Sequence, residues 1–271
     1  MTGPRLTVRE PAVAGTFYDA DPARLAATVD DLLEGAASAD VGARPVALVA
    51  PHAGYVYSGP VAASAYALLR PHAASVRRVV LLGPSHFVPV RGMAVPTATA
   101  FATPLGEVPV DVAACLQAAA GSAAVAVADG PHAQEHALEV QLPFVQRMLE
   151  EQTAVVPVVV GGASADTVAD VLDVLTPEDD RDTVVVVSTD LSHYLDHDAA
   201  RRRDRATAEA VVRRDPDAIG SRDACGAVPL RGLLAWANRH GLHASLLDLR
   251  TSADTAGGRG RVVGYGAFRL D

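Results

Sequence analysis

Short apolar runs without internal alternation are the feature of this sequence that most restricts its fold. The clearest covers residues 183–188 and reads Thr-Val-Val-Val-Val-Ser, and a comparable run at 46–50 stops at a proline and a histidine. Such runs are typical of strands that are buried on both faces, as in a parallel sheet. Further strands are predicted at 79–82, 124–128, 155–160, 244–249 and 261–270.

Segments with helical spacing alternate with these strands. In residues 21–35, Asp21 can cap a helix, Pro22 suits its first turn, and apolar residues recur every three or four positions. The alternation predicts an α/β fold with a central, mostly parallel sheet flanked by helices. We find no linker or repeat, so residues 1–271 are expected to form a single domain. Further helices are predicted at 60–69, 111–120, 138–144 (kinked or restarted at Pro143), 164–175, 198–214 and 228–238, with a hairpin-like excursion at 93–110.

Composition and charge exclude several classes of protein. The formal net charge is -9 with a pI near 5.4, which argues against nucleic acid as a partner, since phosphate binding needs a clustered basic surface. The one basic run, 201–203, is interpreted as the solvated face of a helix. No apolar segment approaches the roughly 20 residues of a membrane span. Residues 1–5 lack the apolar core of a signal peptide, so a cytoplasmic protein is expected.

Four histidines are predicted to follow strand ends directly: His52, His86, His136 and His193. Ligands of open α/β sheets bind outside the carboxyl ends of the strands, so four imidazoles at that edge favour a functional site. Gathered imidazoles repel each other when charged, so they are best explained as neutral metal ligands or as acid and base groups around a metal. The remaining candidates look exposed and are left out of the site: His72, His197, His240 and His243.

The string His132-x-x-Glu135-His136 suggests a more specific alternative to the site at the strand ends, because it matches the inverted zinc-protease pattern. In that pattern two histidines one helical turn apart bind zinc, and the glutamate activates water. Against it, Gly130-Pro131 places His132 at the very start of any helix, and Pro143 soon disturbs that helix. We therefore do not favour the protease interpretation.

The two cysteines lie far apart in unlike contexts, so we expect thiols and no disulfide. Cys115 falls among alanines and is interpreted as a small buried residue. Cys225 precedes a predicted helix, whose dipole would favour a thiolate and hence reactivity or metal ligation. A buried structural role for Cys225 remains open on sequence alone.

Several strings together resemble the MEMO1 family, called protein B of the AmmeMemoRadiSam gene systems. They occur in family order along nearly the whole chain: Ala14-Gly-Thr-Phe-Tyr18, Pro51-His-Ala-Gly-Tyr-Val-Tyr-Ser-Gly59, Gly83-Pro-Ser-His86, Glu135-His-Ala-Leu-Glu-Val-Gln-Leu-Pro-Phe144, Ser188-Thr-Asp-Leu-Ser-His193, Cys225-Gly226 and Gly264-Tyr-Gly266. The resemblance implies a fold similar to class III extradiol dioxygenases, non-haem iron enzymes that cleave aromatic rings beside a catechol hydroxyl.

Carried over residue by residue, the resemblance implies a metal site made by His52, His86 and Cys225. His193 would match the acid/base histidine of the dioxygenases, and the same pocket would be lined by Asp190, Glu135 and His136. The dioxygenases hold iron with two histidines and a carboxylate, so the thiol makes this site softer. Iron(II) is expected, with copper or zinc as alternatives.

The function expected from the resemblance is that of a non-haem iron(II) or copper redox enzyme acting on a small aromatic or other chelating substrate. A protein that binds metal or peptide without turnover is the first alternative, and a zinc-dependent hydrolase the second. Radical SAM and AMMECR1-type proteins are expected partners on the resemblance alone.

Overall fold

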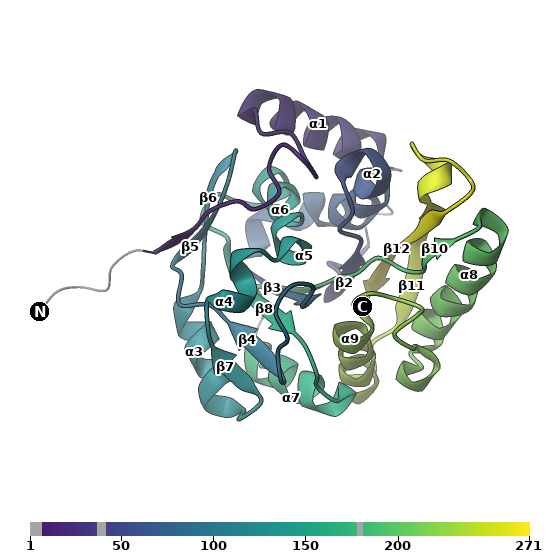
Figure 1. Cartoon of the computed structure of the whole chain (residues 1–271). Coiled ribbons are helices and arrows are strands. Elements are labelled where there is room, and N and C mark those ends of the chain that lie inside the picture. The colour runs from purple at the N-terminus through teal and green to yellow at the C-terminus, as the bar shows by residue number, and fades with distance from the viewer. Residues whose placement is uncertain (1–6, 37–41, 178–180) are drawn as a thin grey trace, which may run out of the picture.

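The computed structural model describes residues 7–36, 42–177 and 181–271, and a nine-stranded sheet forms the centre of this described part (Figure 1). A smaller sheet of β1, β5 and β6 lies beside it. The strands are β1 (Val8–Arg9), β2 (Ala47–Ala50), β3 (Arg78–Pro84), β4 (Met93–Val95), β5 (Ala100–Thr103), β6 (Gly106–Pro109), β7 (Val125–Val127), β8 (Ala154–Val160), β9 (Thr183–Ser188), β10 (His193–Leu195), β11 (Ala244–Thr251) and β12 (Val262–Leu270). Residues 1–5, where the sequence predicts no signal peptide, lie outside the described residues.

The centre of the large sheet is parallel and its flanks are antiparallel. The strand order is β10-β12-β2-β9-β3-β8-β4-β7, with β11 paired to β12. Strands β2, β9, β3 and β8 run parallel, whereas β12 is antiparallel to β2 and β4 is antiparallel to β8. The predicted α/β class is confirmed, and the sheet as a whole is mixed.

Helices cover both faces of this sheet (Figure 1). Helices α1, α2 and α6 contact one another on one side, and α3, α7 and α9 pack together on the other. The helices are α1 (Pro22–Gly35), α2 (Tyr55–Tyr66), α3 (Val112–Gly121), α4 (Gly130–Ala133), α5 (His136–Glu139), α6 (Leu142–Met148), α7 (Ala165–Leu175), α8 (His197–Arg213) and α9 (Ala227–Arg239), with the 3-10 turns η1 (Ala67–Ser75), η2 (Pro216–Ala218) and η3 (Ser252–Asp254). No helix of the described part is both long and apolar enough to cross a bilayer.

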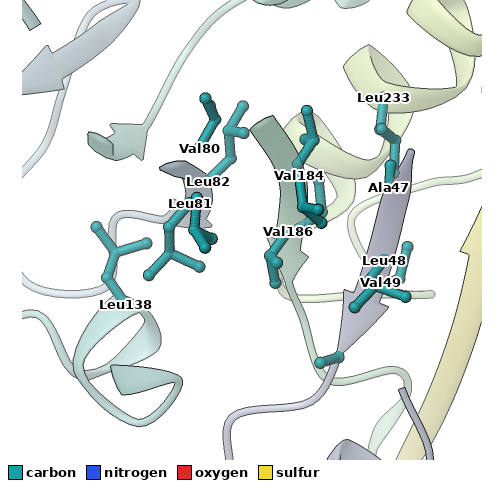
Figure 2. Close-up of a cluster of buried hydrophobic side chains, with 14 of the residues drawn as sticks. Ala47, Leu48, Val49, Val80, Leu81, Leu82, Leu138, Val184, Val186 and Leu233 are labelled. Carbon is teal, nitrogen blue, oxygen red and sulfur yellow. The ribbon is translucent and has the colours of Figure 1, made fainter. Parts of the chain in front are cut away.

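The central strands are buried on both faces, which explains why their sequences do not alternate. Every residue of β2 and β9 is buried, as are all residues of β3 after Arg78. Figure 2 shows their side chains together with Leu138 of α5 and Leu233 of α9. Burying one such Val or Leu side chain contributes roughly 1.5–3 kcal/mol, so these strands form a rigid base for the loops that follow them.

Two local predictions need correction. The helix expected to open at Pro60 begins at Tyr55, and Pro60 lies inside it. Proline removes one backbone bond there, to the carbonyl of Val56, and Val56 is exposed, so water can reach that carbonyl. Within 93–110, only β5 and β6 form the expected hairpin, because β4 joins the large sheet. Pro143 restarts the chain as α6, as predicted.

A buried carboxylate fixes the N-terminal segment to α5. Glu139 is fully buried and forms an ion pair with Arg9. It also accepts hydrogen bonds from the backbone N–H groups of Ala12 and Val13 and from the Tyr18 hydroxyl. Arg9 in turn donates to the carbonyls of His132 and Glu135. One charge pair therefore ties residues 9–18 to α4 and α5.

We expect Glu139→Leu to lower the free energy of unfolding by about 3–5 kcal/mol, because it leaves the Arg9 guanidinium buried without its carboxylate. Urea denaturation followed by circular dichroism measures the change. Glu10→Gln is the matched control, since Glu10 is exposed on the same segment. Equal stability of the Glu139 and Glu10 variants would contradict this account.

Candidate metal centre

Three neighbouring parallel strands deliver a polar residue at the same distance beyond their ends. His52 follows β2, Asp190 follows β9 and His86 follows β3, each two residues after the last strand residue. Because β9 lies between β2 and β3, the parallel register brings these three loops to one edge. The imidazole ring centroids of His52 and His86 are 5.3 Å apart.

The thiol of Cys225 completes a group of three candidate ligands. One ligand atom each from His52, His86 and Cys225 lie within 4.8 Å of one another. His52 Nε2 is 3.3 Å from Cys225 Sγ. Typical metal–nitrogen and metal–sulfur bonds place such atoms roughly 3.5 Å apart around a shared tetrahedral ion, so the donor set fits a metal.

Glycine lets the Cys225 loop lie against the end of β9. A Cβ built on Gly226 would be 2.7 Å from the Thr189 Cβ and 3.0 Å from the Ser188 carbonyl oxygen. The backbone N–H of Gly226 donates to Thr189 Oγ1, and that of Cys225 donates to the Asp190 carbonyl. The thiol thus reaches the site although it comes from the far end of the chain.

Hydrogen bonds fix the tautomer of His52. Ser188 Oγ donates its single hydrogen to the Ala137 carbonyl at 2.6 Å and accepts one from the Gln141 amide at 2.8 Å. His52 Nδ1, 2.9 Å from the same oxygen, must therefore carry the hydrogen and donate it. This leaves the Nε2 lone pair directed at Cys225, as a metal ligand requires.

Glu135 fixes His86 in a similar way. The His86 Nδ1 lies 2.8 Å from Glu135 Oε1, and the backbone N–H of His86 donates to Oε2. Burial opposes ionisation of Glu135, but its bonds to His86 and Ala137 hold its pKa below the usual range. The carboxylate therefore accepts the Nδ1–H, which frees Nε2 of His86 for a metal.

Burial favours the uncharged forms of two of the candidate ligands, His52 and Cys225. It lowers the pKa of His52 to about 3, with a further contribution from His86. Burial, with Asp190 nearby, raises the pKa of Cys225 to about 12. The helix dipole expected to favour a thiolate is therefore outweighed, although α9 does begin two residues after Cys225. Metal binding must displace the thiol proton.

A second group that includes His136 is less suited to a metal. Ligand atoms of His86, Glu135 and His136 also lie within 4.8 Å of one another. However, Glu135 already accepts hydrogen bonds from the His86 backbone, the His86 ring and the Ala137 backbone. Three of its roughly four lone-pair sites are therefore occupied, so we assign it to orienting His86. The His136 ring stacks on that of His86 at 4.6 Å.

The candidate ligands lie in a cleft of about 1100 Å³ that is also lined by His136, Asp190 and His193. His193 Nδ1 lies 2.8 Å from the Leu191 carbonyl, which can only accept, so Nε2 of His193 keeps a free lone pair. Asp190 is buried, and its Oδ1 accepts the backbone N–H of His52. Burial raises the pKa of Asp190. All residues predicted for the site thus gather around this cleft, with Glu135 directly behind His86.

Several sequence expectations differ from the structure. His136 follows no strand end, because it begins α5. His132 lies on the separate helix α4, is buried with Nε2 against the Ala94 carbonyl, and belongs to neither candidate group, so the protease pattern does not assemble. His197 is buried, with Nε2 3.4 Å from Asp254. Of the basic run, Arg203 lines the cleft.

Sequence reasoning missed the residues that position the ligands. Ser188 and Gln141 orient His52, and Glu139 anchors the segment that places Phe17 4.8 Å from His136. Ser188 ends a strand and Gln141 interrupts an apolar stretch, so an isolated polar residue in a buried context was the available signal.

The fold and site define an α/β protein with a two-histidine, one-cysteine candidate metal centre at the carboxyl edge of its sheet. The family model described as Memo-like protein matches residues 9–269. A MEMO1 family protein of Sulfolobus acidocaldarius is 33% identical over 97% of this chain and 99% of its own length. MEMO1 family proteins of Saccharolobus islandicus and Saccharolobus solfataricus are each 32% identical with the same coverage. The chain belongs to the MEMO1 family.

We expect Cys225→Ala to abolish stoichiometric metal binding, because it removes one of the three ligands of the assigned set. Elemental analysis of protein purified without air measures the loss. Cys115→Ala is the matched control, since that thiol is buried in α3 away from the cleft. Full metal content in the Cys225 variant would rule out the assigned ligand set.

Ser188→Ala is expected to weaken metal affinity by about 10–100-fold while leaving the three ligands in place, because the His52 tautomer is no longer fixed. Competition with a chromophoric chelator measures the affinity. Ser64→Ala is the control, since Ser64 bonds on α2 and touches no candidate ligand. Equal affinities of the two variants would contradict the role of Ser188.

Proposed function

We propose that this protein is a metal-dependent redox enzyme that binds a small aromatic or other chelating substrate at the His52, His86 and Cys225 centre. The observation that carries the proposal is the convergence of three candidate ligand atoms in one cleft with the free Nε2 of His193. Three protein ligands leave coordination positions for an exogenous molecule. The resemblance to extradiol dioxygenases supports iron(II) as the metal.

The protein groups have separate tasks in this proposal. A bound metal would supply Lewis acidity and electron transfer. Ser188 and Glu135 hold the imidazole ligands in the tautomer that directs Nε2 into the cleft. His193 accepts a hydroxyl proton of the substrate at Nε2 and returns it later, since its Nδ1–H is held by the Leu191 carbonyl. Phe17 and His136 form an apolar and aromatic wall beside the ligands.

Anaerobic purification and elemental analysis test which metal the site prefers. The softness of the thiol makes copper and zinc the alternatives to iron. Oxygen uptake with a panel of catechols, measured on the iron-reconstituted protein, then tests redox turnover. Uptake that disappears in Cys225→Ala supports the proposal, whereas zinc as the native metal with oxygen-independent ester or amide cleavage would replace it by a hydrolase. No turnover with retained ligand binding would favour a non-catalytic binding protein.

His193→Gln is expected to reduce turnover by about 10²–10⁴-fold, the usual contribution of a general acid or base, without loss of metal. Steady-state kinetics and metal content are measured on the same preparation. His243→Gln is the control, because His243 is exposed outside the cleft. Loss of metal from the His193 variant would show that the assigned role is wrong.

A further inference from the structure

The mouth of the cleft is positively charged although the chain is acidic. Apart from the histidines, the charged residues among its described lining are Arg203, Arg222, Arg261 and a single carboxylate, Asp190. Asp190 is buried at the base and accepts the His52 N–H. Three guanidinium groups in the lining of one cleft, in a protein with net charge -9, create a local field that attracts anions.

Two of these arginines are available to a ligand. Arg203 approaches Asp223 at 3.8 Å, so its charge is partly compensated. Arg222 and Arg261 are exposed, and within the part of the chain that the structure describes neither forms an ion pair. The Arg261 guanidinium lies over the ring of Tyr194, 5.0 Å from its centroid.

Tyr194, in the same cleft lining, is held in an unusual backbone conformation. Its φ is 60°, the left-handed region that non-glycine residues seldom adopt. Because His193 and Leu195 face the consecutive residues Val263 and Val262, Tyr194 is the extra residue of a β-bulge between β10 and β12. Bulges next to functional sites redirect a side chain. Here the residue is 64% exposed, so packing alone does not explain why a tyrosine occupies this position.

Together these observations give one cleft lining an exposed aromatic ring and two guanidinium groups that form no ion pair within the described residues. An aromatic ring of a ligand can stack against Tyr194, while a carboxylate on that ring can accept charge-assisted hydrogen bonds from Arg222 and Arg261. The cleft that holds these groups is continuous with the candidate ligands His52, His86 and Cys225.

We infer that the substrate is an aromatic carboxylate, whose anionic group is recognised by Arg222 and Arg261 in the cleft lining that includes Tyr194. The inference rests on the proposed function, in which the chelating end of the same molecule reaches the metal centre. It adds a specificity determinant that the metal ligands do not supply.

Calorimetric titration of the zinc-reconstituted full chain with 3,4-dihydroxybenzoate, catechol and benzoate tests the inference. The carboxylated catechol is expected to bind at least about tenfold more tightly than catechol. Arg222→Gln and Arg261→Gln are expected to weaken its binding about tenfold each and to leave catechol binding unchanged. Arg202→Gln is the matched control, since Arg202 is exposed on α8 outside the cleft lining.

The variant Tyr194→Gly tests whether Tyr194 contributes to ligand binding or only to the stability of the fold. Glycine accepts the left-handed conformation without strain, so the thermal unfolding midpoint is expected to stay the same or rise. Binding of 3,4-dihydroxybenzoate is expected to weaken about threefold to tenfold, because the stacking face is lost. Unchanged binding in this variant would show that Tyr194 takes no part in recognition.

The two proposals fail in different ways. The anion inference is overturned if catechol and 3,4-dihydroxybenzoate bind with equal affinity. It is also overturned if the arginine variants weaken the binding of both compounds equally. Either result leaves the proposed function intact. If benzoate binds as tightly as 3,4-dihydroxybenzoate and its binding depends on the two arginines, the hydroxyl groups contribute nothing. That result supports anion recognition and overturns the chelating substrate. Failure of all three compounds to bind overturns both.

Discussion

The parallel alignment of β2, β9 and β3 is the constraint on which the site depends. These neighbouring strands end at one edge, and each places a polar residue two positions beyond its end, which brings His52, Asp190 and His86 together. The strands are buried on both faces, so their ends cannot shift without loss of packing. The geometry of the ligands is therefore set by the core of the sheet.

Hydrogen bonds at this edge of the sheet determine which nitrogen of each imidazole is free to bind a metal. Ser188 has one hydrogen and gives it to a carbonyl, so His52 must donate at Nδ1. The Glu135 carboxylate likewise accepts a hydrogen bond from Nδ1 of His86. Both imidazoles consequently present Nε2, and the half-buried Cys225 thiol, whose pKa is raised, lies 3.3 Å from Nε2 of His52. The two imidazoles therefore need no change of tautomer to ligate a cation.

The sequence predicted the α/β class, and it marked His52 and His86 as candidates, because both inferences depend on local patterns. Buried strands read as apolar runs, and a histidine after such a run marks the carboxyl edge. Cys225 was identified through resemblance, since no local pattern brings it to His52. The orienting residues Ser188 and Gln141 were missed, because their roles follow from which donor faces which acceptor across the fold. The left-handed backbone conformation of Tyr194 could not be predicted for a related reason, because its bulge arises from pairing with β12.

The position of β12 has a consequence for how the site is built during translation. This strand is synthesised after every other strand of the sheet, yet it lies between β2 and β10. Strand β10, which begins with His193, pairs with β12 and lies next to no other strand in the described sheet. A nascent chain on the ribosome can therefore assemble β2, β9 and β3 while His193 is still unanchored. The side of the cleft that carries His193 is therefore completed after the strand ends that carry His52 and His86.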